Sequence, residues 1–505
     1  MTSQNDEIIE HPRMLFFLSF FCFTIGIMCG IIPDISLGIE VSLFLGLLMV
    51  LLGGWKRWYI VFLVITISFL GWYLGRSDYQ SREIEWTLLN RETSGFSGSY
   101  AITGKVEKLL YTTDLSSTYR LHIDKIANIS TKNITNIEDK NIGILFEVPK
   151  NLHISIGDTI EYSGKITSII KYPLKGFSSY SWYHRAYGKS SVPMFQRITK
   201  NNPNILDRVQ LWSKGVIFRG FPENVAGIIL GMTIGNIELL SSETKKYFTN
   251  SGITHILVVS GSNIAFVIVI LTGILRYIPI GRWTRASVVI LFVLLYGSLV
   301  GWDMPVIRAV AMGLITYIAI EGGKKSSSIA ILFAVGFGIL IYSPLALIYD
   351  AGFGLSFSGT LGILLFHSPI QSLITKKYIP KFFIDIISVT IAASIGSMIA
   401  IIYHFGVIPI YTLFSNILIS GVLGWILFSS ILYLLFALIG GWVLYIWGWT
   451  IYIPTAYIMW VGSFFGNNYT YTLDEKLTEP ISLFCIGIMI SIVLIMEKSK
   501  LLQSK

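Results

Sequence analysis

Long apolar runs occupy both ends of the chain, and a segment with a different pattern lies between them. A helix of about 20 apolar residues crosses roughly 30 Å of hydrocarbon, so we expect these runs to span a membrane. The predicted spans are Met14–Pro33, Ile39–Gly54, Trp58–Gly75, Ile253–Tyr277, Ala286–Val300, Pro305–Ile320, Ile329–Ile348, Gly352–Phe366, Ile386–Tyr403, Thr412–Leu438, Trp442–Phe465 and Ile481–Met496. The pattern therefore predicts a polytopic α-helical membrane protein of about 12 spans, some of them broken or re-entrant.

Between residues 76 and 200 the apolar runs give way to regular charges and to alternating apolar and polar positions. This alternation is typical of half-buried β-strands. The predicted strands are Ser99–Leu110, Thr118–Ile129, Ile142–Val148 and Thr159–Ile170. Short strands over about 100 residues indicate a small β-barrel or sandwich.

A third pattern begins at Ile205, where apolar and charged residues recur with the spacing of an amphipathic helix. Arg208, Lys214 and Arg219 recur among apolar residues, which is typical of a helix that lies at a membrane interface. The predicted domains are N-terminal transmembrane helices over 1–75, a β domain over 76–200, amphipathic or interfacial helices over 201–252 and a second transmembrane domain over 253–505.

The composition agrees with a place in the bilayer. The 505 residues are 53% hydrophobic and 13% charged, whereas soluble globular proteins are usually about 25% charged. A soluble multidomain enzyme, a disordered protein and a secreted disulfide scaffold are excluded on this ground. Cys22, Cys29 and Cys485 lie in apolar runs, where a free cysteine behaves as a small hydrophobic residue.

The net charge of +9 fits either a polyanionic partner or basic cytoplasmic loops. Basic loops alternate with acidic or uncharged loops along the whole chain if both termini are cytoplasmic. The basic loops contain Lys56 and Arg57, Arg276, Arg282 and Arg285, Lys324 and Lys325, Lys376, Lys377 and Lys381, and the tail after Glu497. This orientation places the β domain outside the membrane.

The end of the external domain combines cations with aromatic rings. No Asp or Glu occurs between Ser163 and Leu206. Cations that neutralise phosphates and rings that stack on bases suit single-stranded nucleic acid, each stacked base contributing ~1–3 kcal/mol. The alternative is that the rings pack a small core or lie at the membrane interface. The residues predicted to bind DNA are Lys165, Lys171, Lys175, Tyr180, Trp182, Tyr183, Arg185 and Lys189.

Polar residues also cluster at the start of the span that begins at Ile253. His255, Ser260 and Asn263 lie in or beside hydrocarbon, where polar groups are costly unless they face a cavity or a partner. Gly261 would let the helix break or let a neighbouring backbone approach. The alternative is ordinary hydrogen bonding between helices, at about 0.6 kcal/mol for each bond.

Two further features lie in later spans. Pro305 suits the first turn of a helix, which places Arg308 where its charge opposes the helix dipole, so it needs a counter-ion or an anionic ligand. The alternatives are a pair with Asp303 or a side chain that snorkels to the interface. The Gly- and Ser-rich stretch from Asp350 through Ser356 indicates a broken segment or a tight helical hairpin.

Signals for catalysis are weak. Gly188-Lys189-Ser190 has Tyr183 where a phosphate-binding loop requires Gly, so no ATPase motor is predicted. The histidines are scattered without metal-ligand spacing. We therefore predict no catalytic residue, no metal and no cofactor.

Four ordered blocks resemble the ComEC family, the inner-membrane DNA channel of bacterial natural competence. They are Leu230-Gly231 to Gly235 followed by Phe248 and Thr254 to Gly261, then Arg308 to Met312, then Asp350 with Gly352 to Phe357, and Asn416 after Phe414. The external β domain is similar to the OB-like module of that family. The resemblance thus covers most of the chain.

The resemblance implies a competence-type channel domain over 253–505 in the bacterial inner (plasma) membrane, which carries single-stranded DNA and is not an enzyme. The implied DNA path contains His255, Ser260, Gly261, Asn263, Arg308, Asp350, Ser356 and Asn416. The expected partners are single-stranded DNA, the lipid bilayer, a cytoplasmic ATPase or helicase that pulls the strand, an external DNA receptor and a separate nuclease. A homo-oligomer is left open.

The sequence departs from the family at two places. The family usually has Gly-Leu-His where this chain has Gly261-Ser262-Asn263, so no role is transferred to a second histidine. Many relatives end in a metallo-β-lactamase-like domain, and here the chain ends at Lys505, so we expect strand degradation to come from another protein.

Two other functions are compatible with the sequence. One is a transporter of another polyanion or of a lipid on the same scaffold. The other is an intramembrane serine hydrolase that uses Ser260 and His255. It is disfavoured, because five residues on a helix turn through about 140°, and because Val258 stands where rhomboid-type proteases usually have Gly.

Overall fold

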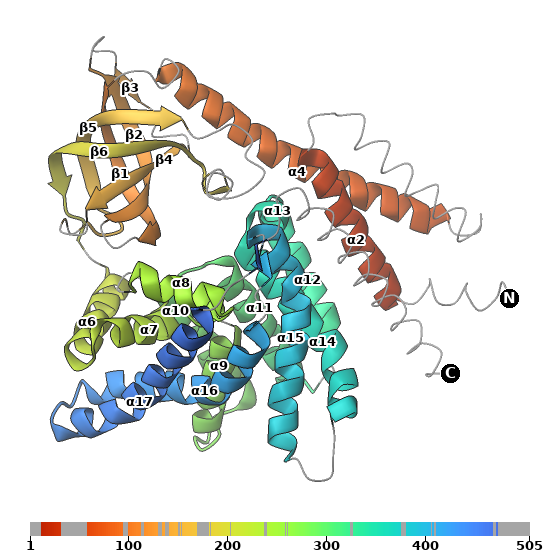
Figure 1. Ribbon diagram of the computed structural model, residues 1–505. Helices are drawn as coiled ribbons and strands as arrows, with labels where there is room; N and C mark the ends of the chain where they lie inside the picture. The colour runs from red at the N-terminus through yellow and green to blue at the C-terminus, as the bar shows by residue number, and fades with distance from the viewer. Residues whose placement is uncertain are drawn as a thin grey trace. The chain divides into compact units, whose positions relative to one another are not determined.

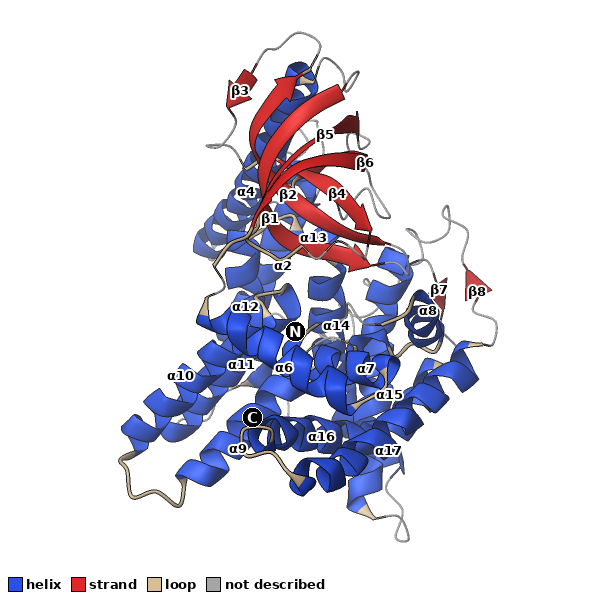
Figure 2. Ribbon diagram, turned by 90° about the vertical axis from the view of Figure 1, so that its left-hand side faces the viewer, coloured by secondary structure: helices blue, strands red, loops and turns tan. Residues whose placement is uncertain are grey.

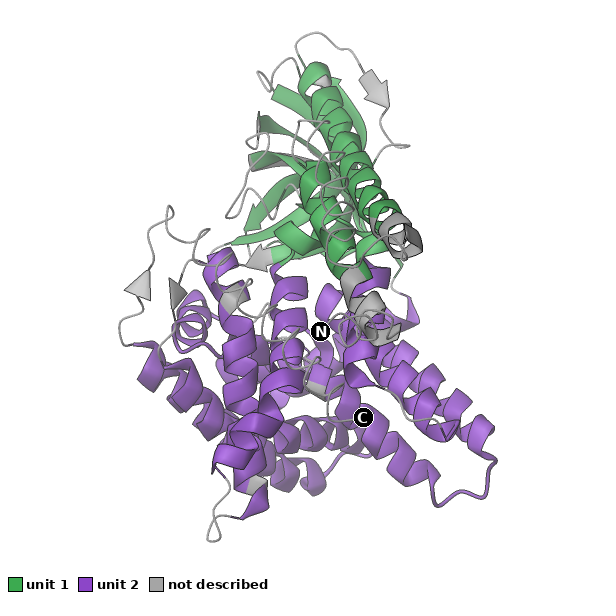
Figure 3. Ribbon diagram, turned by 90° about the vertical axis from the view of Figure 1, so that its right-hand side faces the viewer, with its two compact units in different colours: residues 1–202, 340–350 green, residues 203–339, 351–505 purple. Residues whose placement is uncertain are grey.

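The computed structural model of the chain is shown in Figure 1. It describes residues 12–31, 58–93, 99–112, 116–129, 134–136, 141–149, 152, 154–168, 181, 183–202, 204–236, 240–257, 259, 261–323, 327–374, 380–405, 407–408, 411–467 and 471–472. The chain divides into two compact units (Figure 3). Unit 1 contains residues 1–202 and 340–350, and unit 2 contains residues 203–339 and 351–505.

Unit 1 begins with two helices in close backbone contact, α2 (Pro12–Ile31) and α4 (Trp58–Glu92). Glycines spaced by four residues make this contact. A Cβ atom on Gly26 or Gly30 would overlap the backbone of α4, and one on Gly71 or Gly75 would overlap that of α2. Small residues with this spacing let membrane helices approach closely, so the pair depends on these glycines.

Helix α4 is longer than the apolar pattern predicted. The predicted span ended at Gly75, but the helix continues to Glu92, so the boundary predicted at residue 76 falls inside a helix. The reason is packing. Leu89 is fully buried in the core of the β domain, and Trp86 packs against the same core, so the polar half of α4 lies against the strands (Figure 2).

The strands of unit 1 form a closed ring. Their bounds are β1 (Ser99–Thr112), β2 (Ser116–Asn128), β3 (Ile134–Asn136), β4 (Gly143–Pro149), β5 (Thr159–Ser168) and β6 (Ala186–Thr199). The order around the ring is β1-β2-β4-β6-β5 and back to β1, while β3 extends β2 at the side. The β4–β6 pair is parallel, and the other pairs are antiparallel. This confirms the small sheet that the alternation predicted.

Strand β1 closes the ring because it is long and irregular. Its register against β2 shifts after Thr103, after Val106 and after Leu109. At the first shift Gly104 lies so close to the His122 carbonyl that a Cβ atom would overlap it. Shifts of this kind bend a strand, which lets β1 pair with both β2 and β5. The core inside includes Tyr100 and Tyr162.

The sequence pattern did not predict β6. Its segment contains Gly188, Lys189, two serines and Pro193, which are poor strand formers. Pairing with β4 on one side and β5 on the other forms the strand in spite of this composition. Tertiary contacts therefore override local preference here.

An ion-paired cluster joins α4 to the β domain. Glu85 accepts hydrogen bonds from Arg185 and from the Tyr187 hydroxyl, the latter at 2.6 Å. Asp78 lies 3.2 Å from both Arg82 and Arg185. Burial first, and then the negative charge of Glu85, raises the pKa of Tyr187 well above its ordinary value of 10. The stability that Tyr187 contributes is complete below that value and is lost only as pH rises through the raised pKa.

Helices dominate the chain from residue 205 on. They are α6 (Ile205–Gly220), α7 (Glu223–Ile234), α8 (Ser242–Asn250), η2 (Thr254–Ile256), α9 (Gly261–Leu275), α10 (Arg282–Val300), α11 (Met304–Glu321), α12 (Ser328–Tyr342), α13 (Ala346–Tyr349), α14 (Ala351–Ile374), α15 (Lys381–Phe405), α16 (Thr412–Phe436) and α17 (Trp442–Gly466). Strands β7 (Val407–Ile408) and β8 (Tyr471–Thr472) form a small pair.

Four helices of the described part, α10, α11, α14 and α16, are long and apolar enough to cross a membrane. The spans predicted over Ile39–Gly54 and Ile481–Met496 lie outside the described residues. The predicted total of about 12 spans stays a prediction. The segment Ile253–Tyr277 is not one helix, because the chain forms a single 3-10 turn, η2, and starts again as α9.

The amphipathic region proves to contain two kinds of helix. Helix α6 begins with Asn204, whose side chain caps the Asp207 amide, and it exposes Ile205, Leu211 and Phe218 as an interfacial helix would. Helix α7 is different, because residues 225–234 are all buried in the core that α7 shares with α16 and α17. The prediction of amphipathic helices over 201–252 is therefore wrong for α7.

The α14–α15 crossing yields the first testable prediction. A Cβ atom on Gly396 would overlap the backbone at Ser358 and Gly362, whereas Gly421 on α16 has open space around it. We expect Gly396→Val to lower the free energy of unfolding by about 1–3 kcal/mol through overpacking. The matched variant Gly421→Val should be neutral or slightly stabilising. Thermal unfolding of both variants in detergent checks this, and equal stabilities would contradict the close crossing.

The cluster around Glu85 yields the second prediction. Glu85→Ala leaves Arg185 and Tyr187 without their acceptor, and loss of one partner of a buried pair costs ~3–5 kcal/mol. We expect about 3 kcal/mol, the low end of that range, because the Arg185 side chain is 23% exposed. Gln80→Ala, an exposed position on α4, is the control. Chemical unfolding of unit 1 within the full chain gives the measurement, and a loss equal to that of the control would contradict this role.

Candidate functional site

The chain turns before α9, and the polar residues predicted from the block Thr254 to Gly261 lie at this turn. Gly252 has a φ of 73°, a left-handed conformation that favours glycine. The Ser415 hydroxyl on the first turn of α16 donates to the Ser251 carbonyl at 2.6 Å and fixes this turn. His255 follows in η2 on an exposed side. Ser260 lies outside the described residues.

Asn263 serves the packing of the helices. Its side-chain amide donates to the Met232 carbonyl of α7 at 2.9 Å, and the residue is only 8% exposed. The Tyr296 hydroxyl of α10 donates in the same way to the Thr233 carbonyl at 2.9 Å. Of the two interpretations of Asn263, hydrogen bonding between helices is therefore the one that its contacts support.

Arg308 is the charged group at the centre of the candidate site. It lies on α11 and is 8% exposed, so it does not snorkel to an interface. Its Nη1 donates to the Thr360 hydroxyl of α14, and its Nε is buried without a partner among the described residues. Arg308 forms no ion pair within the described part of the chain, which also removes the alternative pairing with Asp303.

Gly261 lies directly beside this guanidinium group. A Cβ atom on Gly261 would stand 3.0 Å from Nη2 of Arg308 and 3.6 Å from Cβ of Ala309. Val259, Ile264 and Val306 pack in the apolar core around this contact. Two blocks that lie far apart in the sequence are thus joined at the first residue of α9.

Helix α14 supplies further polar groups. The Thr360 hydroxyl donates to the Ser356 carbonyl at 2.8 Å, and the buried Ser358 hydroxyl has no partner within the described residues. A Cβ atom on Gly354 would lie 3.0 Å from Nε2 of His404 on α15. The sequence did not single out Thr360 or His404, although a His beside an apolar run is a signal that could have found His404.

Asn416 and Asp350 lie on other elements of the fold. Asn416 is on the first turn of α16, and its side-chain oxygen is buried without a hydrogen-bond partner among the described residues. Asp350 ends α13 and belongs to unit 1. In unit 1 its charge adds to the effect of burial, and the pKa of Tyr183 is raised above its ordinary value.

The predicted external DNA-binding residues are only partly described. Lys171, Lys175, Tyr180 and Trp182 lie outside the described residues. Tyr183 is 7% exposed, and its hydroxyl lies 3.2 Å from the Ser343 hydroxyl, so its ring offers no free face to a base. Arg185, at a φ of 54°, is held by Glu85 and Asp78. The contacts of Tyr183 and Arg185 thus serve the fold of unit 1, and DNA binding by these two residues stays a prediction.

Two lysines predicted to bind DNA have different surroundings. Lys189 on β6 forms an ion pair with Glu147 at 2.8 Å. Hydrogen bonds from Lys189 and from Ser116 hold the pKa of Glu147 below its ordinary value. Lys165 on β5 is exposed and stays in the predicted surface.

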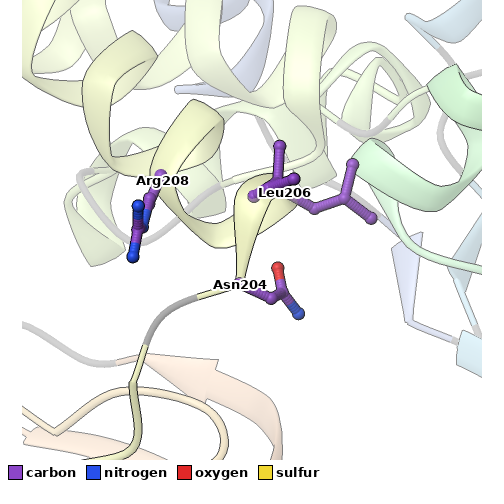
Figure 4. A pocket seen from close by; sticks show the side chains of 4 residues that line it. Asn204, Leu206 and Arg208 are labelled. Carbon is purple, nitrogen blue, oxygen red and sulfur yellow. The ribbon is translucent and has the colours of Figure 1, made fainter.

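We also searched the described residues for a metal site and for surface hollows. Among the described residues, no group of three or more His, Cys, Asp or Glu side chains could hold a metal ion. A surface hollow at the first turn of α6 is lined by Asn204, Ile205, Leu206 and Arg208 (Figure 4). It contains none of the residues predicted for the DNA path.

The second half of the chain is similar to known proteins. Residues 232–500 match the family model described as Competence protein, which is more than half of the chain. ComE operon protein 3 of Bacillus subtilis (strain 168) is 26% identical over 201 residues, 39% of this chain and 24% of that protein. An uncharacterized protein of Aquifex aeolicus (strain VF5) is 30% identical over 192 residues, 35% of this chain and 45% of that protein.

The chain thus spans less than half the length of these two relatives. No solved structure matches the chain. The family match and the candidate spans of the described part together make this a membrane protein. The chain belongs to the competence protein family.

Proposed function

We propose that the chain carries single-stranded DNA across the bacterial inner membrane during natural competence. The observation that carries the proposal is Arg308, a cation buried in a candidate span without an acidic partner among the described residues. Charged residues inside membrane helices are rare and mark pathways for ions or substrates. The family match supports DNA as the substrate.

The proposal requires a polar path. Even one charged side chain at the centre of the bilayer costs ~2.5–3.5 kcal/mol, so a strand of phosphates cannot cross hydrocarbon unaided. An interior-negative potential opposes each entering charge by ~2.3 kcal/mol per 100 mV. A cytoplasmic ATPase or helicase that pulls the strand is therefore part of the proposal. The path residues that we keep are His255, Ser260, Gly261, Arg308, Ser356 and Asn416.

We further propose that the ring of unit 1 is an OB fold that receives the strand. Five strands in the order β1-β2-β4-β6-β5, with one parallel pair, support this assignment. Lys105 on β1, Lys165 on β5 and Arg197 on β6 are exposed. Lys105 is opposite Thr159, and Arg197 is opposite Glu161. Thr159, Glu161 and Lys165 lie an even number of residues apart on β5, so their side chains point to the same side of that strand. The three cations therefore lie on the outer face of the barrel.

Binding of single strands by this face gives the third prediction. The purified chain should bind a dT oligonucleotide with an affinity that falls steeply as salt rises. Lys165→Glu should weaken binding and reduce the slope of log K against log salt by about 0.7, the value for one phosphate contact on a single strand. Arg276→Glu, an exposed change outside the barrel, is the control and should leave the slope unchanged. Equal slopes in the two variants would contradict the assignment.

The path itself gives the fourth prediction. Arg308→Glu places an anion where the strand must pass, so we expect entry of labelled DNA into the cytoplasm to be abolished. The protein should remain in the membrane at the level of the Arg276→Glu control, measured by immunoblot of membrane fractions. Normal DNA entry in the Arg308→Glu cells would refute the proposed path. Loss of transport of another polyanion or of a lipid, with DNA entry intact, would favour that alternative substrate.

A further inference from the structure

We propose that Arg308 and the first turn of α9 together form a binding site for one phosphate-class oxyanion. That the oxyanion is a phosphodiester of a DNA strand rests on the proposed function, but the site itself rests on geometry. Three features carry it: the start of a helix, an arginine edge without partners among the described residues, and a glycine that lets the arginine approach the helix.

The first feature is the start of α9. This helix runs from Gly261 to Leu275, and the first N–H groups of a helix have no partner within it. The aligned peptide dipoles place a partial positive charge of about half an elementary charge at this end. Helix N-termini therefore bind phosphate and other anions when a second group helps to hold them.

The second feature is the free edge of the arginine. Nη1 of Arg308 is engaged by Thr360, whose hydroxyl in turn donates to the Ser356 carbonyl. This fixes the plane of the guanidinium group and leaves the edge formed by Nε and Nη2. Nε is buried and has no partner in the part of the chain that the structure describes. An edge of two parallel N–H donors matches two oxygens of a phosphate or carboxylate, which a lysine cannot do.

The third feature is the proximity of the two. Nη2 lies 3.0 Å from the position that a Cβ atom on Gly261 would occupy. A buried cation thus stands against the positive end of a helix, an arrangement that is repulsive without an anion. An oxyanion bound there would accept from the arginine edge and from N–H groups in the first turn of α9. Gly261 lets the guanidinium group approach this end of the helix, since a side chain there would press against Nη2.

The experiment uses the purified full chain in a nonionic detergent, with inorganic phosphate as the probe. Thermal unfolding is followed in sodium phosphate and in sodium chloride at equal ionic strength. We expect phosphate, but not chloride, to raise the Tm of the unmodified chain in a saturable way. Arg308→Met should abolish this rise, and the control Arg276→Met should keep it.

Further variants keep the test informative if Arg308→Met does not fold. Arg308→Lys keeps the charge but loses the paired donors, so we expect at least tenfold weaker phosphate binding. Gly261→Ala should also weaken binding, because its methyl group enters the space beside Nη2. A phosphate response that survives in both variants, or equal responses to phosphate and chloride in the unmodified chain, would overturn the site.

Competition distinguishes the source of the oxyanion. A dT oligonucleotide that reduces the phosphate response identifies a strand phosphate, whereas a response to phosphatidylglycerol nanodiscs alone identifies a lipid headgroup and overturns the DNA assignment. Different results would refute the oxyanion site and its use in DNA transport. Lost phosphate binding in Arg308→Lys with normal DNA entry would refute the use of the site in transport. DNA entry that needs Arg308 without any phosphate response would refute the oxyanion site.

Discussion

Hydrocarbon provides no hydrogen bonds, and this constraint shapes the helical unit. Polar side chains among its apolar helices find partners on neighbouring backbones, as Asn263 does at the Met232 carbonyl and Ser415 at the Ser251 carbonyl. These bonds tie α9 to α7 and the turn before it to α16. Arg308 departs from the rule, because one edge of its guanidinium group remains without a partner in the described residues. The function that we propose follows from this exception.

The two units meet the same constraint in different ways. Glycines bring helices together in both units, as at the α14–α15 crossing and between α2 and α4. Among the described residues of the helical unit, Arg308 is the charged residue that is buried. In unit 1 several charges are enclosed but paired, since Glu85 and Asp78 hold Arg185 against α4. Removing one partner of a buried ion pair is costly, so these paired charges serve the fold. A buried charge without a partner is instead a candidate for ligand binding. This difference separates the structural arginine Arg185 from the candidate site at Arg308.

The sequence predicted the elements better than the contacts. Apolar length located α10, α11, α14 and α16, and alternation located β1, β2, β4 and β5, because both signals are local. Strand β6 was missed because its pairing partners, not its composition, form it. The block around Gly261 and Arg308 was identified from sequence, but Thr360 was not. A threonine in an apolar helix does not by itself indicate a site, and Thr360 belongs to this one only because α11 places Arg308 beside it.

In the function that we propose, DNA enters the cytoplasm through this chain. The most direct test of this role is the amount of labelled DNA that becomes protected inside cells with and without the gene, scored separately from DNA held at the cell surface. We expect entry to be lost without the gene while surface binding persists, because the barrier to phosphates is the membrane itself. Unchanged entry in cells that lack the gene and have no second competence-family chain would rule out this role.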